Sequence, residues 1–201
     1  MRTWFRRSST VTGLAFAALA AIATSATAQE QVQAGFLAGA SFSTLTGVDS
    51  FSVRSSTGFA GGFYVAIPVA KSLKVEPEIL YINKGAGLED TGVTLNLNYI
   101  EIPVLLRYQF TDNGGPFAYV GPYLGLNMAC NTSVDTVSVS CGDQQDPTIQ
   151  PNTNVGGTIG VGFQRDTWGF DIRYDYAFGN AIKEEDGKNS TLMVLLRLAV
   201  N

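Results

Sequence analysis

This chain of 201 residues has few side chains that are suited to catalysis, and it lacks the most versatile catalytic residue type. Glu76 and Glu78 are two carboxylates with the spacing of one strand face, and paired carboxylates are a common basis for acid–base catalysis. The chain contains no histidine, which is the commonest general base and the commonest metal ligand. Enzymes that depend on a histidine are therefore excluded. We expect the glutamates to form salt bridges inside the protein, and we predict no catalytic, metal or cofactor site.

The two cysteines, Cys130 and Cys141, both fall in the segment that we expect to be the longest loop. In an oxidising compartment they would form a disulfide, which would stabilise the fold by roughly 2.5 to 3 kcal/mol on loop-entropy grounds. A metal site is the alternative, but it would lack further ligands. A loop closed in this way either presents a surface to the outside or resists proteolysis.

A glycine-rich stretch, GTIGVG at 157–162, resembles a phosphate-binding loop. No Lys-Ser or Lys-Thr pair follows it and no helical pattern does, so alternating small residues on one strand face explain it better. Acidic residues cluster in three expected loops, at 89–90, 143–146 and 184–186. We interpret them as solvated loop tips, with weak bridging of divalent cations to anionic lipid headgroups as the alternative.

The N-terminal residues have the layout of a secretory signal peptide. Three arginines precede an apolar run over residues 11–22, and a small-x-small cleavage motif ends at Ala28. The polar residues that follow the arginine pair favour the ordinary secretory route over the twin-arginine route. We therefore predict a cleaved signal peptide at residues 1–28 and a single domain at residues 29–201.

The composition of residues 29–201 limits both partners and membrane insertion. Ten basic residues remain there against 17 acidic ones, and no basic patch suggests binding to nucleic acid. No later window approaches the about 18 consecutive apolar residues of a transmembrane helix. If the protein enters a membrane, it must do so as a closed barrel, in which every backbone group is paired.

A period of two runs through the chain after residue 30, and no helical period competes with it. Clusters of Gly, Pro, Asn and Asp divide the chain into eight segments of alternating polarity. The segments cover residues 33–45, 57–69, 72–84, 94–110, 116–128, 154–164, 168–179 and 191–200. The connections are alternately long and short, and the longest, of about 25 residues, begins at Ala129. This pattern predicts an all-β fold, an eight-stranded up-and-down antiparallel barrel.

Every segment has one apolar face and one face of small and charged residues. In the stretch 98–110, the even positions from Ile100 to Phe110 are apolar, whereas Glu101 and Arg107 share the other face. A soluble lipocalin-like barrel would turn the apolar face inward, and a transmembrane β-barrel would turn it outward into lipid. Gly and Ser dominate the other face, which suits a crowded interior, and its charges are nearly balanced in sign. The pattern favours the transmembrane β-barrel.

Aromatic residues of the apolar face gather toward the strand ends, as in the two girdles of a transmembrane barrel. The predicted girdles are Tyr108, Phe110, Trp168 and Phe170 near the short turns, and Phe42, Phe59, Tyr81, Tyr176 and Phe178 near the long loops.

The charges of the inner face must pair with one another, because side chains just fill an eight-stranded barrel. The predicted interior charge network contains Lys74, Glu76, Glu78, Glu101, Arg107, Asp171, Arg173, Asp175 and Arg197. In the hairpin around residues 87–92 we assume that paired residue numbers sum to about 178, which places Glu101 beside Glu76 and Glu78. In the hairpin around residues 183–188 we assume a sum of about 370, which places Arg173 opposite Arg197. We expect the glutamates to face the two arginines across the lumen, which would argue against a diffusion pore. Isolated charges that reach either rim are the alternative.

Two prolines stand within strands that should be hydrogen-bonded on both sides. Pro103 and Pro77 lie on neighbouring segments, and each removes a ladder donor in a medium that supplies no water. We therefore expect a local bulge or widened pairing where these two strands meet.

Three stretches carry a resemblance to a known family: LKVEPEILYINKGA at 73–86, LNYIEIPVLLRYQF at 97–110 and PFAYVGPYLGLNM at 116–128. They are similar to the small outer-membrane β-barrel domain called porin-family or PorT-like, and the likeness extends over the chain after the signal peptide. It implies an outer-membrane barrel of eight strands, similar in architecture to the membrane domain of outer membrane protein A. Most members of the family have no assigned activity, so the resemblance implies no catalytic or binding residues.

The sequence therefore predicts a monomeric, non-enzymatic protein of a Gram-negative outer membrane that displays four long loops outward. The expected partners are outer-membrane lipid and the barrel-assembly machinery, and an extracellular ligand at the loops is left open. A narrow channel for small solutes and a secreted lipocalin-like ligand carrier are the alternative functions.

Overall fold

The computed structural model describes residues 31–46, 53–88, 93–112, 114–134, 137–140, 153–182 and 185–200. The predicted signal peptide and Cys141 lie outside these residues, as do the acidic positions 89–90 and 143–146. In the described part of the chain, no helix is long and apolar enough to cross a membrane.

The described residues form nine strands, eight of which occupy the eight predicted segments. The strands are β1 (Gln33–Thr46), β2 (Val53–Ala70), β3 (Leu73–Leu88), β4 (Val93–Gln109), β5 (Gly115–Val134), β6 (Val137–Ser140), β7 (Asn154–Arg165), β8 (Trp168–Ile182) and β9 (Glu185–Val200). The short strand β6 lies in the longest predicted connection.

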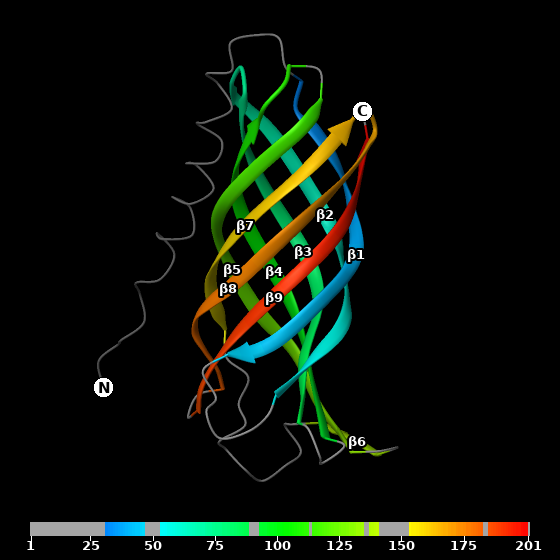
Figure 1. The fold of residues 1–201 in the computed structure, drawn as a ribbon, viewed down its shortest axis with the longest axis vertical. Helices are drawn as coiled ribbons and strands as arrows, with labels where there is room; N and C mark the ends of the chain where they lie inside the picture. The colour runs from blue at the N-terminus through cyan, green and yellow to red at the C-terminus, as the bar shows by residue number, and fades with distance from the viewer. Residues whose placement is uncertain are drawn as a thin grey trace, which may run out of the picture.

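The strands pair antiparallel in the order β4-β3-β2-β1-β9-β8-β7-β5, and β4 also pairs with β5. This last pairing closes the wall, because it joins the two ends of that order (Figure 1). β6 pairs with the end of β5, from Asn131↔Ser140 to Val134↔Val137, and extends away from the wall. The predicted eight-stranded antiparallel barrel is confirmed.

One rim of the barrel carries short turns, at residues 71–72, 110–114 and 166–167. Asp166 has a φ of 51° and Gly114 a φ of 85°, left-handed values that are typical of tight hairpin turns. β6 lies at the opposite rim, where the long connections begin (Figure 1). The alternation of short and long connections therefore assigns one kind to each rim, as the sequence predicted.

The strands run further toward the long connections than predicted. β2 begins at Val53, β3 ends at Leu88 and β5 ends at Val134. Ile182 on β8 pairs with Glu185 on β9, so the loop predicted from residue 180 is largely strand. Polar and glycine residues in these segments suggested loops, but an antiparallel neighbour still offers backbone partners there, and the hairpins continue past the apolar part of the wall.

Side-chain exposure alternates along the wall, with the apolar residues outside. On β4, the residues from Glu101 to Gln109 alternate between buried and exposed. On β9, Leu196 is 64% exposed, whereas its neighbour Arg197 is 0% exposed. An apolar outer surface around a charged interior suits lipid, and it is the reverse of a lipocalin-like carrier, so that alternative is wrong.

The ladder between β3 and β4 keeps a single register but is interrupted in its middle. Pairing stops after Pro77↔Val104 and resumes at Leu80↔Glu101 without a shift of register. Pro77 and Pro103 have no N–H to donate to this ladder. Of the two expected outcomes, a bulge does not occur at this seam, and the locally missing pairs correspond to the widened pairing.

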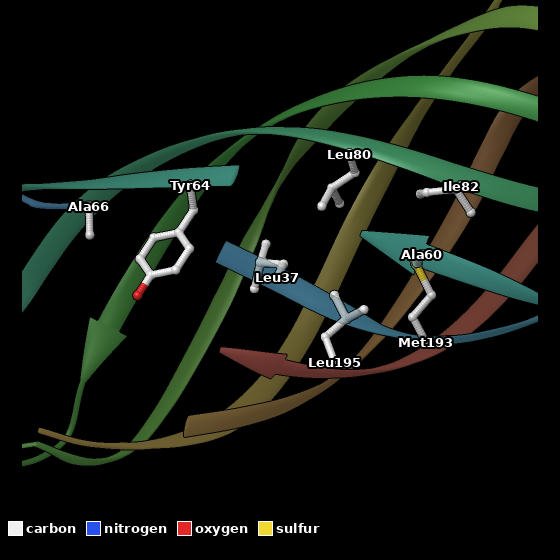
Figure 2. Packing of buried hydrophobic residues seen from close by; sticks show 8 residues of the cluster. All are labelled: Leu37, Ala60, Tyr64, Ala66, Leu80, Ile82, Met193 and Leu195. Atoms are coloured by element: carbon white, nitrogen blue, oxygen red, sulfur yellow. The ribbon is translucent and has the colours of Figure 1, made fainter. Parts of the chain in front are cut away.

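The inner face is not polar throughout. Figure 2 shows apolar side chains of β1, β2, β3 and β9 that converge inside the barrel: Leu37, Ala60, Tyr64, Ala66, Leu80, Ile82, Met193 and Leu195. Each of these is at most 2% exposed. Among the side chains of β1 and β2 whose exposure is described, at 33–44 and 55–70, none is charged, so this cluster fills their side of the lumen and the charges occupy the rest.

Candidate functional site

Six charged side chains meet in the lumen, and we call this group the arginine network. It consists of Glu76 and Glu78 on β3, Arg107 on β4, Asp171 and Arg173 on β8, and Arg197 on β9. Each residue is at most 1% exposed. Three guanidinium groups face three carboxylates, so the formal charges of the network cancel.

Two arginines reach across the lumen to the glutamates of β3. Arg197 Nη2 donates to Glu76 Oε1 over 2.5 Å, and Arg173 Nη1 donates to Glu78 Oε2 over 2.6 Å. Arg173 Nη2 donates to Glu78 Oε1 over 3.1 Å, which makes this pair bidentate. Arg107 Nη1 donates to the second oxygen of Glu76 over 3.0 Å. Because β3 is not a neighbour of β8 or β9 in the wall, the contacts of Arg173 and Arg197 bridge the lumen.

Asp171 completes the network. Its Oδ2 accepts from Arg197 Nη1 over 2.8 Å, and its Oδ1 accepts from the Tyr119 hydroxyl over 2.7 Å. Arg173 Nε donates to the same Oδ1 over 3.4 Å. Every carboxylate oxygen of the arginine network therefore accepts a hydrogen bond, which buried carboxylates need in order to stay charged at an acceptable cost.

Aromatic rings pack against the guanidinium groups of the network. The Cζ atom of Arg107 lies 3.7 Å from the centroid of the Phe117 ring, and that of Arg197 lies 4.3 Å from the centroid of the Tyr64 ring. Tyr119 stacks against Arg173 with a distance of 5.2 Å. Cation–π contacts of this kind stabilise the positive charges further. The sequence analysis did not place these aromatic residues in the network, although all three occupy inward positions of the alternating pattern.

Each of these rings lies over a glycine of the neighbouring strand. Tyr119 and Phe117 stand opposite Gly160 and Gly162 on β7, and Tyr64 stands opposite Gly35 on β1. A β-carbon on any of these glycines would collide with the ring. The glycines of the inner face thus make room for aromatic side chains, and Tyr123 opposite Gly156 repeats the arrangement.

A second polar group, which we call the Lys84 cluster, lies nearer the long-loop rim. Lys84 Nζ is 2.5 Å from Glu101 Oε1, and both side chains are buried. The same ammonium lies 5.7 Å from the ring centroid of Tyr99 and 5.3 Å from that of Tyr123. Asp175 on β8 accepts from Thr158 Oγ1 on β7 over 2.7 Å. Asn154 on β7 flanks Gly125 together with Glu101. The cluster thus consists of Lys84, Tyr99, Glu101, Tyr123, Asn154, Thr158 and Asp175.

Both assumed registers are wrong. Between β3 and β4, Glu101 stands opposite Leu80, so it lies away from Glu76 and pairs with Lys84 instead. Between β8 and β9, Arg173 stands opposite Met193 rather than Arg197. The pairing with β9 changes register between Tyr176 and Ile182, so a register counted from the loop end does not hold within the barrel.

The structure therefore divides the predicted interior charge network. Six members form the arginine network, and Glu101 and Asp175 belong to the Lys84 cluster. Lys74, which stands opposite Arg107, is only partly buried. Lys84 was not among the residues of the predicted network. It is 1% exposed, and it is the only positively charged residue of the Lys84 cluster.

The predicted girdle residues lie on the outer surface. Phe42, Phe59, Tyr81, Tyr108, Phe110, Trp168, Phe170 and Phe178 are exposed, and Tyr176 is partly buried. Tyr108 and Phe110 pack edge to face at 5.2 Å near a short turn, and Tyr176 and Phe178 do so at 6.3 Å on the long-loop side. These contacts give both ends of the wall an aromatic surface.

Cys130 is buried beside Leu97 and Tyr99 on the inner side of β5. It faces inward because the pairing of β4 with β5 shifts by one residue between Asn98 and Tyr99, which reverses the alternation beyond that point. Its predicted disulfide with Cys141 stays a prediction, since Cys141 lies outside the described residues. Within the described ranges, no group of three or more His, Cys, Asp or Glu residues is arranged to hold a metal ion.

Comparisons with known proteins agree with this architecture. The attachment invasion locus protein Ail of Yersinia pestis is 13% identical, and the match covers 85% of this chain and 100% of that chain with a TM-score of 0.51. Neisserial surface protein A is 15% identical, over 84% of this chain and 99% of that one, also with a TM-score of 0.51. At these identities the likeness shows the fold alone. No curated protein sequence matches the chain. The family described as "Outer membrane protein beta-barrel domain" matches residues 27–183, and the chain belongs to this family of small outer-membrane β-barrels.

Proposed function

We propose that this protein is a non-catalytic, monomeric outer-membrane barrel that serves as a closed platform for its outward loops. The observation that supports this proposal best is the arginine network, whose six buried charges bridge β3 with β8 and β9 across the lumen. A solute path through this level would have to separate charge pairs that are out of contact with water. Separating one such pair costs about 3–5 kcal/mol, which opposes a lumen that conducts at rest.

Reconstitution into planar bilayers tests the closed barrel against the narrow channel. We expect no conductance steps from the intact protein. A variant in which Glu78 and Arg173 are both replaced by alanine removes a bidentate pair and should conduct, which makes it the positive control for correct insertion. Regular conductance steps from the intact protein that respond to the same substitution would refute the closed platform.

The loops are the second part of the proposal. Strands β2, β3, β5, β8 and β9 carry the hairpins beyond the apolar wall, and β6 adds a strand beside the end of β5. This surface is suited to contacts with a ligand outside the cell. We propose that a Cys130–Cys141 disulfide closes the β5–β6 hairpin, in which Asn131 pairs with Ser140. Binding of labelled cells to host or matrix surfaces, compared between the intact protein and a variant that lacks residues 135–150, tests the role of this loop.

The same proposal covers export and assembly. The apolar outer surface requires outer-membrane lipid as a partner, and insertion of a closed barrel requires the barrel-assembly machinery. Residues 1–28 would act as a cleaved signal peptide. Sequencing of the mature N-terminus from isolated outer membranes should begin at Gln29. The protein should also migrate differently on a gel before and after heating, because outer-membrane barrels stay folded in detergent until they are heated.

A further inference from the structure

The Lys84 cluster differs from the arginine network in its balance of charge. The arginine network has three cations and three carboxylates, whereas the Lys84 cluster has one cation, Lys84, and two carboxylates, Glu101 and Asp175. Arg173, two residues from Asp175 on β8, is engaged by both oxygens of Glu78. The Lys84 cluster therefore carries a formal charge of −1 in a place where both carboxylates are at most 1% exposed.

The two groups also differ in how well their oxygens are paired. All carboxylate oxygens of the arginine network accept hydrogen bonds. In the Lys84 cluster, five buried oxygens have no hydrogen-bond partner: Glu101 Oε2, Asp175 Oδ2, Asn154 Oδ1 and the hydroxyls of Tyr99 and Tyr123. The amide nitrogen Nδ2 of Asn154 has none either. The residues that carry them are at most 2% exposed. A buried polar group without a hydrogen-bond partner is costly. These oxygens therefore require a bound species that the protein itself does not provide.

The unpartnered oxygens come from strands that lie side by side. Glu101 stands opposite Gly125 on β5, and Gly125 stands opposite Asn154 on β7. A β-carbon on Gly125 would lie 3.4 Å from Glu101 Oε1 and 3.5 Å from Asn154 Cβ, so these two side chains flank the same glycine. The rings of Tyr99 and Tyr123 both pack against the Lys84 ammonium that pairs with Glu101, and Asp175 accepts a hydrogen bond from Thr158 on β7. The side chains that carry these oxygens thus lie around Lys84 and on the adjoining strands β4, β5, β7 and β8.

We propose that the Lys84 cluster binds one monovalent metal cation, of which sodium is the smallest common example. The carboxylate oxygens of Glu101 and Asp175 would neutralise the ion, and Asn154, Tyr99 and Tyr123 would complete an oxygen coordination shell. Hard cations prefer such carboxylate, carbonyl and hydroxyl oxygens. Bound water would satisfy the oxygens but leave the charge of −1. A bound proton would cancel the charge but leave most of the oxygens unpaired. A single cation cancels the charge and satisfies the oxygens at once, whereas water and a proton would both have to be bound to do the same.

Thermal unfolding of the full barrel in detergent tests the site. The melting temperature is measured in sodium chloride and in N-methylglucamine chloride at equal ionic strength, because the organic cation is too large for the lumen. We expect a sodium-specific rise that amounts to about 3–5 °C for each tenfold increase in sodium above the dissociation constant. Equal melting temperatures in the two salts would overturn the proposal in favour of water, and a difference that pH alone produces would overturn it in favour of a proton.

Variants separate the site from general salt effects. Asp175→Asn should abolish the sodium-specific rise, because it removes the unbalanced charge. Asp112→Asn, which removes an exposed carboxylate in a short turn, is the matched control and should keep the rise. Tyr123→Phe keeps the ring beside Lys84 and removes one oxygen, so it tests the site even if Asp175→Asn does not fold. It should raise the half-saturating sodium concentration about tenfold, and an unchanged value would contradict the proposed coordination.

Discussion

Arg197 on β9 and Glu76 on β3 lie 2.5 Å apart across the lumen, although 121 residues separate them in the chain. Each also bonds to a further partner, Asp171 for Arg197 and Arg107 for Glu76. The pair is therefore the centre of a chain of charged groups that ties three parts of the wall together. Its contribution to stability differs from that of a surface ion pair, because neither partner can be solvated when the other is lost.

Replacement of Arg197 by methionine should destabilise the barrel by about 3–5 kcal/mol, because Glu76 and Asp171 would lose a buried partner. Equilibrium unfolding by urea in detergent, followed by tryptophan fluorescence, measures this. Lys71→Met is the matched control, since Lys71 forms an exposed ion pair with Asp112 and its loss should cost less than about 1 kcal/mol. Equal effects of the two substitutions would mean that the arginine network is not a structural element of the barrel.

Replacement of Gly160 by alanine should displace the Tyr119 ring and weaken its hydrogen bond to Asp171. We expect a loss of about 1–3 kcal/mol, which is typical of overpacking. Gly179→Ala is the control, because a β-carbon there meets nothing within 4 Å. In the background Tyr119→Ala the cost of Gly160→Ala should largely disappear, and an unchanged cost would argue against the ring as its cause.

Replacement of Ile172 by arginine tests the outward face. Ile172 lies in the middle of β8, pairs with Val161 and Val194, and is 45% exposed. An arginine there would meet the lipid core, and folding into vesicles should be less favourable by about 2–4 kcal/mol. Val32→Arg, at an exposed position before β1, should cost about 0–1 kcal/mol, as expected near the membrane surface. A soluble barrel would show no such dependence on depth.

Reduction of the protein tests the Cys130–Cys141 prediction. If the disulfide forms, reductant should lower the free energy of unfolding by about 2.5 to 3 kcal/mol, because the unfolded chain gains loop freedom. Alkylation of the unfolded, unreduced protein should then label neither cysteine. Labelling of both without reductant would show that the cysteines are free, and Cys130→Ala should in that case change the stability only through packing against Leu97 and Tyr99.

The sequence determined the period of each strand, and with it which side chains face lipid and which face the lumen. Alternation is a local property of an extended chain, so Leu196 and Arg197 could be assigned to opposite faces without knowledge of any neighbour. The alternation of short and long connections likewise predicted the up-and-down barrel. The presence of charges inside could be predicted too, since a lipid-facing arginine is costly.

The register between β3 and β4 could also have been restricted from the sequence. Inward residues have even numbers on β3 and odd numbers on β4, and directly opposed residues share a face. Their numbers must therefore sum to an odd value, which excludes about 178 as an assumed register. The observed pairs, such as Leu80↔Glu101, obey this rule. On β8 and β9 the inward residues are odd on both strands, so parity did not exclude the wrong register there.

Only the tertiary structure decided which inward charges meet. Glu76 reaches Arg197 and Lys84 reaches Glu101 because closure of the wall and the register of each strand pair set the height of each strand. These offsets depend on contacts between strands that are distant in the chain, and a local pattern carries no record of them. The sequence alone therefore determined the face of each charge, and the closed barrel determined its partner.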